Sequence, residues 1–333
     1  MATNHANHTV LVTGANAGLG FDSARQLALS GWGRVFISAR SQAKADGAIA
    51  RLVEATGRPA GDFGAAIFDN NKPETVRAAV SALAKAGQSF DALVLNAGGV
   101  AQLDEAGKPR LTDAGLSTMY TMNVHGHALF VDGLLEAGLL SAGATVMFAG
   151  SEASRGIPAM RIATPVLPEG LGDLDATLEA VMRGDHAAQK GYDSMVDYGT
   201  VKLIGTVWMR VLSQRHGLRA LTVSPGFTGG TEAMDKLPAF QRVMFRYVAL
   251  PIMKLLGNAH DLEFGARRYV QALEDQDLQA GGFYASAGQG ISGDLAAQDP
   301  SLQPLLLDPA FEAAVTRLID RQLGKPAGLR TVG

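Results

Sequence analysis

The sequence predicts an α/β fold built on a doubly wound parallel sheet, and three observations carry that prediction. Short apolar runs alternate with segments of helical periodicity along most of the chain. A glycine-rich turn follows the first apolar run, and Tyr198 and Lys202 form a Tyr-x-x-x-Lys pattern late in the chain. Such alternation is typical of right-handed β-α-β crossovers, which place helices on both faces of a parallel sheet.

The apolar pattern places the individual elements. We expect strands at Val10–Thr13, Arg34–Ser38, Ala65–Phe68, Ala92–Asn96, Ala144–Phe148, Ala220–Ser224 and Gly282–Ala285. We expect helices at Gly18–Ser30, Gln42–Thr56, Lys72–Gly87, Thr112–Gly138, Asp193–His216 and His260–Glu274. No Pro/Ser-rich or charged linker divides the 333 residues, so residues 1–333 are expected to form a single domain.

Two segments interrupt the alternation. Residues 152–197 form an insertion between the fifth strand and the helix of Tyr198, and a connection of this length usually has a function or structure of its own. Residues 231–258 are rich in Met, Phe and Leu, and we interpret them as a substrate lid. Their apolar stretch Val243–Leu256 could also dock on a membrane surface, but the pattern favours a lid or core packing.

Composition excludes several function classes. Lys and Arg total 29 against 32 Asp and Glu, and the net charge of −3 favours neither nucleic acid nor an anionic membrane as a partner. The absence of cysteine removes disulfides, thiolate catalysis and thiolate metal sites. His125 and His127 would point to different faces of a helix, so no metal site is expected. The polar start and the lack of a membrane-length apolar stretch predict a cytoplasmic protein without stable membrane insertion.

The turn after the first strand predicts a nucleotide site of the Rossmann type. Gly14 can adopt backbone angles closed to other residues, Gly18 allows backbone to approach a pyrophosphate, and Gly20 allows close packing of helix on strand. The free N–H groups at the start of the helix would hold the phosphates. The whole turn reads Thr13-Gly14-Ala15-Asn16-Ala17-Gly18-Leu19-Gly20, and mere packing is the alternative for its glycines.

Tyr198 and Lys202 indicate proton chemistry. Residues four apart share one face of a helix, so the Lys202 ammonium is expected beside the Tyr198 phenol. A nearby positive charge favours the phenolate and is expected to lower the Tyr198 pKa from about 10 towards neutrality. The same spacing also occurs by chance on surface helices, so the pair alone is weak evidence.

Taken in order, these motifs resemble the short-chain dehydrogenase/reductase family from about Thr9 to Ala285. Besides the glycine turn, the matching positions are Asp69 after the third strand, Asn96-Ala97-Gly98-Gly99 after the fourth, Asn123, Ser151 after the fifth strand, Tyr198 with Lys202, and Pro225-Gly226. The resemblance implies a catalytic tetrad of Asn123, Ser151, Tyr198 and Lys202. It implies a nicotinamide cofactor held by Gly14, Asn16, Gly18, Leu19, Gly20, Asp69, Asn96, Ala97, Gly98, Tyr198, Lys202, Pro225 and Gly226.

The resemblance also implies a role for each member of the tetrad. A hydride would pass between C4 of the nicotinamide and a carbonyl carbon, while Tyr198 exchanges a proton with the oxygen and Ser151 hydrogen-bonds it. Lys202 would bind the nicotinamide ribose, and Asn123 would hold a water beside Lys202. Ser154 competes with Ser151 for the serine role, but Ser151 is the first hydroxyl after the strand. The role of Asn96 is expected to be mainly structural.

The cofactor is expected to be NADP, with NAD less favoured. The stretch after the second strand reads Val35-Phe36-Ile37-Ser38-Ala39-Arg40-Ser41 and lacks the acidic residue that would accept from a ribose 2′-hydroxyl. Arg40 offers a guanidinium that suits a 2′-phosphate, the alternative being a solvated arginine.

Within the family, the insertion is similar to that of monomeric carbonyl reductases. Gly150-Ser151, Leu171-Gly172-Asp173-Leu174, the lid and Gly282-Phe283-Tyr284 are similar to light-dependent protochlorophyllide reductases and retinol-dehydrogenase-like members. Those pigment enzymes have a substrate-side cysteine that this chain lacks. We therefore expect an NADP-dependent oxidoreductase acting on the carbonyl or alcohol of a bulky apolar substrate. The alternatives are a silent NADP-sensing protein and reduction of a C=C bond.

The insertion also bears on assembly. Family members commonly pair through the helices that carry Asn123 and Tyr198. Tyr198 follows Ser151 by 47 positions, and so long an insertion needs apolar surface on which to pack. We expect it to cover the outer faces of those helices, which slightly favours a monomer over a homodimer.

Overall fold

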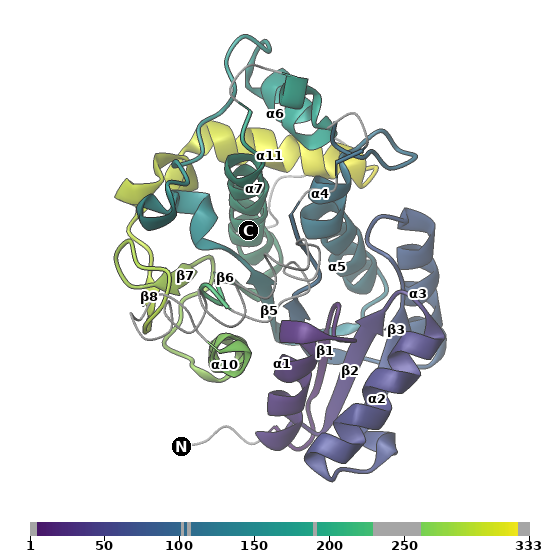
Figure 1. Ribbon diagram of the computed structural model, residues 1–333. Helices are drawn as coiled ribbons and strands as arrows, with labels where there is room; N and C mark the ends of the chain where they lie inside the picture. The colour runs from purple at the N-terminus through teal and green to yellow at the C-terminus, as the bar shows by residue number, and fades with distance from the viewer. Residues whose placement is uncertain (1–4, 101–102, 105–107, 189–191, 229–260, 326–333) are drawn as a thin grey trace.

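An eight-stranded sheet lies at the centre of the computed structural model, which describes residues 5–100, 103–104, 108–188, 192–228 and 261–325 (Figure 1). The strand order is β3-β2-β1-β4-β5-β6-β7-β8. Strands β1 to β7 pair in parallel, and β8 runs antiparallel to β7. The chain reverses its direction of winding between β1 and β4, and doubly wound sheets bind ligands at the carboxyl edge of such a switch point. The predicted fold class is confirmed.

The elements of the described chain have the following bounds. The strands are β1 (Thr9–Val12), β2 (Arg34–Ala39), β3 (Phe63–Ile67), β4 (Phe90–Leu95), β5 (Leu140–Ala149), β6 (Arg219–Val223), β7 (Phe283–Ser286) and β8 (Leu295–Ala297). The helices are α1 (Gly18–Leu29), α2 (Gln42–Thr56), α3 (Pro73–Lys85), α4 (Thr118–Tyr120), α5 (Gly126–Glu136), α6 (Leu174–Arg183), α7 (Ser194–His216), α10 (Leu262–Glu274) and α11 (Pro309–Gln322). A π-helical turn, Thr121–His125, joins α4 to α5, and short 3-10 turns lie at Ala60–Asp62, Glu152–Arg155, Pro158–Met160, Asp185–Ala188, Pro300–Leu302 and Pro304–Leu307.

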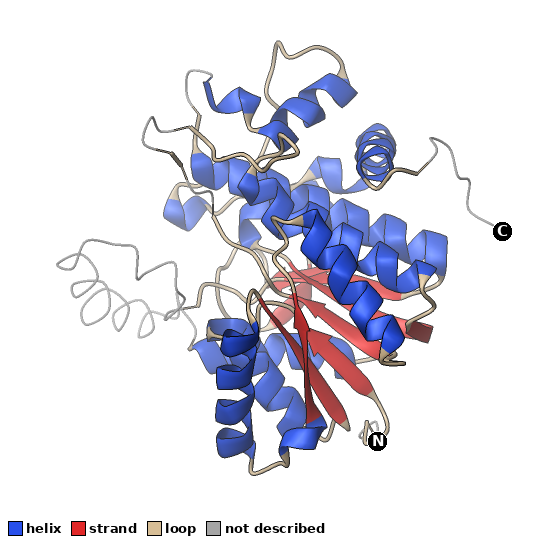
Figure 2. Cartoon of the chain, turned by 90° about the vertical axis from the view of Figure 1, so that its right-hand side faces the viewer, coloured by secondary structure: helices blue, strands red, loops and turns tan. Residues whose placement is uncertain are grey.

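Helices cover both faces of the sheet (Figure 2), and each face buries its own apolar cluster. On one face α1, α2 and α10 contribute Leu27, Leu52 and Leu273 to a cluster with Val10 and Val12 of β1. On the other face α3, α5, α7 and α11 contribute to a second cluster, whose members include Val76, Phe130, Ile204 and Leu318. Strands buried on both faces consist largely of apolar residues, which explains why the apolar pattern predicted β1, β4 and β6.

Local end signals explain why α2 has the bounds that the sequence predicts. The side chain of Ser41 accepts a hydrogen bond from Lys44 N at the start of the helix. At its end Gly57 adopts a φ of 68°, a left-handed conformation that favours glycine.

The structure extends or corrects several other expectations. All seven predicted strands are present within a few residues, and β8 was not predicted. The helix expected over Thr112–Gly138 begins only at Thr118 and is broken by the π-helical turn. The insertion at 152–197 has structure of its own, chiefly α6. The lid expected at 231–258 lies outside the described residues, and α10 begins at Leu262.

Helix α11, which the sequence analysis did not identify, lies across α7 and beside α6 (Figure 1). A small cavity between α5, α7 and α11 is lined by Val131, Leu212 and Ile319. Lys325, just after α11, pairs with Asp132 of α5. Helix α11 therefore packs on α7 and reaches α5 at this cavity and at the pair of Lys325 and Asp132, where the insertion was expected. No helix in the described part of the chain combines the length and the apolarity needed to cross a membrane.

Candidate active site

The glycine turn packs closely against the segment after β4 because Gly14 and Gly20 lack side chains that would collide with it. Gly14 has a φ of 63°, and a Cβ there would lie 3.0 Å from Ala97 Cα. A Cβ at Gly20 would lie 2.5 Å from Asn96 Nδ2. Gly18 has a φ of 57° and begins α1, whose N-cap residue Ala17 supplies no side-chain cap. The first N–H groups of α1 therefore remain available to an anion, which fits the phosphates of a dinucleotide.

Neighbouring strands hold the turn in place. Asn96 Nδ2 donates to Thr13 O at 2.9 Å, and Ala97 N donates to Thr13 Oγ1 at 2.9 Å. Gly14 N donates to Ser38 Oγ at 3.0 Å. Asn96 thus has the structural role expected of it, while Ser38 was missed because a serine inside a strand carries no signal of its partner.

Asn123 lies in the π-helical turn, fully buried, with its side chain bound to two backbone segments. Its Nδ2 donates to Gly99 O and Met119 O, both at 2.8 Å. Its Oδ1 accepts from Gly99 N at 3.2 Å. A Cβ on Gly98 would lie 2.4 Å from Asn123 Oδ1 and 3.3 Å from Lys202 Nζ. The Asn123 amide and the Lys202 amine therefore flank Gly98.

Tyr198, Lys202 and Ser151 converge at the carboxyl end of β5. Lys202 Nζ donates to Ala149 O at 2.7 Å and lies 5.6 Å from the centroid of the Tyr198 ring. The Tyr198 hydroxyl is hydrogen-bonded to Ser151, whose Oγ also accepts from Ala153 N at 3.2 Å. Gly199 allows α7 to approach this site closely, since a Cβ at this position would lie only 2.4 Å from Ala153 O. The four residues of the expected tetrad thus lie together.

The expectation that Lys202 lowers the Tyr198 pKa is wrong for this structure. Burial raises the pKa of Tyr198 to about 12, the hydrogen bond from Ser151 opposes that rise, and the charge of Glu152 adds to it. Burial also lowers the pKa of Lys202 to about 7. Lys202 is consequently only partly charged at neutral pH, so its effect on the phenol is weak. Tyr198 is held in its protonated form, which suits a proton donor.

Ser151 and Ser154 have different surroundings. Ser154 is fully buried, and its Oγ has no hydrogen-bond partner among the residues that the structure describes. Ser151, bonded to Tyr198, is the serine placed for chemistry. An apolar wall packs beside Tyr198, and it consists of Ala153, Ile157, Ile162 and Ile291 with Met195, Val196 and Phe227.

Arg40 and Asp69 lie at the cofactor edge of the sheet. Arg40 follows β2, is exposed, and forms no hydrogen bond or ion pair with the residues that the structure describes. Asp69 is half-buried after β3, where its Oδ1 accepts from Asn71 N at 3.0 Å. Gly226, with a φ of 76°, donates its N–H to Ser224 Oγ at 3.2 Å in the turn after β6. Leu19 packs partly buried against the cluster under α1, and Asn16 O accepts from Arg51.

His127 is a buried residue whose role the sequence analysis missed. Its Nδ1 lies 3.1 Å from Asn123 O, and since a carbonyl only accepts, Nδ1 carries the proton. Nε2 then accepts from Thr13 Oγ1 at 3.0 Å. Burial lowers the His127 pKa to about 3, so the ring is neutral. His127 thereby links the Asn123 turn to the glycine turn, and the described residues contain no cluster suited to a metal ion.

Comparison with known proteins adds sequence relatives. Residues 8–162 match the family model described as short chain dehydrogenase. The chain is 34% identical over 128 residues to protochlorophyllide reductase of Chlamydomonas reinhardtii, a match covering 38% of this chain and 31% of that protein. It is 39% identical over 89 residues to short-chain dehydrogenase anuI of Penicillium roqueforti, covering 27% of this chain and 34% of that one. The chain thus spans about a third of the length of these two curated relatives.

Solved structures show the same fold at low identity. The actinorhodin polyketide ketoreductase with NADPH is 19% identical with a TM-score of 0.55, covering 83% of this chain and 93% of that one. The L-sorbose reductase of Gluconobacter frateurii, complexed with NADPH and L-sorbose, is 14% identical with a TM-score of 0.60, covering 87% and 98%. Identities this low establish the likeness of fold alone.

Proposed function

We propose that this chain, whose residues 8–162 match the short chain dehydrogenase family model, is an NADP-dependent oxidoreductase of that family that acts on a carbonyl or alcohol of a bulky, largely apolar molecule. The observation that carries the proposal is the row formed by Asn123, Lys202, Tyr198 and Ser151 at the carboxyl end of β5. This row lies beside the switch point of the sheet, next to a glycine turn whose missing side chains suit a dinucleotide.

In the reductive direction each side chain has a separate task. A bound nicotinamide would supply the hydride. Ser151 hydrogen-bonds the substrate oxygen and holds it against Tyr198. The Tyr198 hydroxyl gives its proton to that oxygen as the alkoxide forms, and its raised pKa keeps the proton in place until then. Lys202, within reach of the ribose side, would return a proton to Tyr198 and regain one from solvent, and Asn123 on the other side of Gly98 would hold the water that connects Lys202 to solvent.

The preference for NADP is supported by Arg40. The residue is exposed at the end of β2, and the stretch from Val35 to Ser41 contains no carboxylate that would accept from a ribose 2′-hydroxyl. An arginine without a protein partner is free to pair with a 2′-phosphate. Both solved structures described above are complexes with NADPH, which agrees with this preference.

The apolar wall beside Tyr198 supports the substrate class. Ile157 and Ile162 belong to the insertion, and Ile291 and Phe227 come from the loops after β7 and β6. Such a wall favours an apolar body around the reacting carbonyl. The partial match to a protochlorophyllide reductase favours reduction of a C=C bond as the second candidate.

A panel experiment tests the proposal. NADPH and NADH oxidation is followed with ketones, aldehydes and α,β-unsaturated ketones of increasing apolar size, and the products are identified by mass spectrometry and NMR. Alcohol products support carbonyl reduction, and saturated ketones support the second candidate. Tight NADPH binding without turnover of any compound contradicts both and indicates a silent sensor.

The cover over α5 and α7 supports a monomer in solution. Ile319 of α11 lies against the outer faces of both helices, and the pair of Lys325 and Asp132 fixes the end of this cover. Pairing of two chains through α5 and α7 would require α11 to be displaced from these helices. Light scattering coupled to gel filtration is expected to give a mass near 34.7 kDa, and a mass near four times that value contradicts the expectation.

A further inference from the structure

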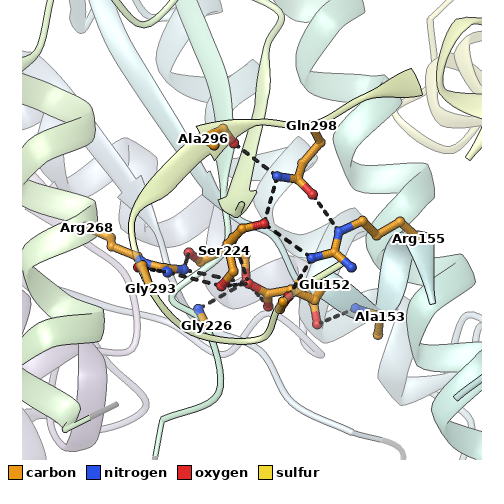
Figure 3. Close-up of polar contacts among 12 residues, drawn as sticks. Glu152, Ala153, Arg155, Ser224, Gly226, Arg268, Gly293, Ala296 and Gln298 are labelled. Atoms are coloured by element: carbon orange, nitrogen blue, oxygen red, sulfur yellow. Dashed lines mark hydrogen bonds and ion pairs between the residues drawn. The ribbon is translucent and has the colours of Figure 1, made fainter. Parts of the chain in front are cut away.

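A buried carboxylate lies directly after the catalytic serine, and the proposed reaction leaves it without a task. Glu152 has 3% of its surface exposed, and Figure 3 shows it at the centre of a polar cluster that joins four segments. Its Oε1 accepts from Ser286 N at 3.2 Å and from Ser286 Oγ at 2.9 Å. Its Oε2 accepts a hydrogen bond from Ser224 Oγ.

The direction of the hydrogen bonds follows from the groups. An ionised carboxylate only accepts, so the Ser224 hydroxyl gives its one proton to Glu152. The Ser224 oxygen then accepts from Gly226 N at 3.2 Å. The carboxylate, the hydroxyl and the amide thus form a chain that ends in the Pro225-Gly226 turn, on the side where the nicotinamide is expected.

Two buried arginines lie in the cluster: Arg268 pairs with the carboxylate, and both arginines bind the neighbouring loops. Arg268 of α10 lies 3.6 Å from Glu152 through Nη1, which also donates to Ser224 O at 3.0 Å. Its Nη2 donates to Ser286 Oγ at 3.1 Å and Gly293 O at 2.6 Å. Arg155 donates to Gly290 O at 2.6 Å and to the side chain of Gln298. The cluster therefore fixes the segment after β5, the turn after β6 and the loop after β7 against one another.

We propose that Glu152 is a positioning residue that, through Ser224, aligns the Pro225-Gly226 turn with Ser151 and Tyr198. Ser151 and Glu152 are consecutive, so a displacement of the Glu152 carboxylate also displaces Ser151 on the substrate side of the site. The hydrogen bond from the Ser224 hydroxyl couples the same displacement to the Pro225-Gly226 turn on the cofactor side. Hydride transfer depends steeply on such alignment, because an error of about 1 Å can cost on the order of a hundredfold in rate. The inference rests on the proposed oxidoreductase function.

Ser224→Ala is the variant that tests the relay while leaving the buried charges intact. It removes the hydroxyl between Glu152 and Gly226 and keeps both arginines paired. Thr222→Val is the matched control, because Thr222 is buried two residues earlier on β6 and its Oγ1 has no partner among the described residues. Both variants and the wild type are compared by kcat, KM, NADPH affinity and the isotope effect with 4-deuterated NADPH.

Ser224→Ala is expected to lower kcat about tenfold, to raise the isotope effect, and to weaken NADPH binding about threefold, whereas Thr222→Val leaves all three unchanged. A loss shared equally by both variants, at equal thermal stability, overturns the proposal. A double-variant cycle tests whether Glu152 acts through Ser224. If it does, adding Ser224→Ala to Glu152→Gln causes little further loss of kcat. Additive losses contradict the relay.

The outcomes separate this inference from the proposed function. If the wild type reduces a carbonyl and Ser224→Ala matches it in kcat and NADPH affinity, only the positioning role is wrong. If the wild type binds NADPH but reduces nothing, the proposed function is wrong, and NADPH affinity still tests the positioning role. Weaker NADPH binding by Ser224→Ala but not by Thr222→Val supports that role. Equal NADPH binding by the wild type and Ser224→Ala contradicts it. A wild type that does not bind NADPH overturns both.

Discussion

The half of the sheet that carries the glycine turn and the half that carries the Glu152 cluster hold their shape in different ways. Around the turn, neutral groups such as Thr13, Ser38 and Asn96 bond to backbone atoms of adjacent strands. Around Glu152, buried charges join segments up to 143 positions apart. Breaking a buried ion pair by removing one partner costs about 3–5 kcal/mol, while a neutral hydrogen bond contributes about 0.5–1.5 kcal/mol.

The difference suggests that the two halves of the sheet have different functions. In the proposed reaction the first half would hold the cofactor through its backbone, so substitutions there are expected to change mainly cofactor affinity. The second half would supply the acid and the hydroxyl that act on the substrate, so substitutions there are expected to change mainly turnover. Tyr198 and Lys202 lie where the halves meet, and they test the division most severely.

The largest effect is expected for Tyr198→Phe. The ring retains its packing against Ile157 and Ile162, but the proton donor is lost, so kcat is expected to fall about a hundredfold or more. NADPH affinity, measured by fluorescence titration, is expected to remain within error of the wild type. Substantial turnover by the Phe variant would remove Tyr198 from the mechanism.

Lys202→Met is expected to affect both halves. It removes the amine that lies between Asn123 and Tyr198, and with it the expected contact to the nicotinamide ribose. We expect kcat to fall about tenfold or more and NADPH affinity to weaken as well. Steady-state kinetics and cofactor titration check the two parameters separately, and a change in only one of them would show that Lys202 has a single role.

Arg40→Ala is expected to act on the cofactor half alone. A charge-assisted pair with a phosphate contributes about 1.5–3 kcal/mol, which corresponds to a preference for NADPH over NADH of about tenfold or more. The variant is expected to narrow this preference and to leave kcat with saturating NADPH unchanged. Equal affinities of the wild type for the two cofactors would contradict the assignment of Arg40.

The smallest effect is expected in the pH dependence of the free energy of unfolding, and it arises from His186 in the insertion. His186 Nε2 lies 2.8 Å from Asp197 Oδ1, and the Tyr192 hydroxyl donates to Asp197 Oδ2 at 3.0 Å. Burial alone would lower the His186 pKa, but the hydrogen bond and charge of Asp197 raise it above 6.5. The stabilisation is therefore fully present below about pH 6.5 and is lost as the pH rises through the raised value.

Thermal unfolding of the wild type and of His186→Gln between pH 5.5 and 8.5 measures this contribution. The wild type is expected to lose about 1 kcal/mol of stability across the range relative to the variant, which corresponds to a few degrees in Tm. Parallel curves for the two proteins would show that the pair contributes no pH dependence.

Local pattern predicted the framework because its determinants lie close together in the sequence. The strands β1, β4 and β6 are mostly apolar, and Ser41 and Gly57 directly flank the two ends of α2. The glycine turn could be recognised because backbone angles and missing side chains are local properties. The motif order, read as a family resemblance, located Asn123, Ser151, Tyr198 and Lys202 along the chain.

The sequence by itself determined this framework and the order of the chemical groups, and tertiary structure decided how those groups behave. Burial of Lys202 lowers its pKa and leaves Tyr198 protonated, which the four-residue spacing could not show. Ser151 differs from Ser154 only through their partners in space. The pair of Lys325 with Asp132 and the pair of Glu152 with Arg268 each join residues more than a hundred positions apart, and β8 pairs with β7 in the antiparallel sense. Desolvation and long-range pairing depend on which surfaces meet after folding, and neither leaves a periodic signal in the chain.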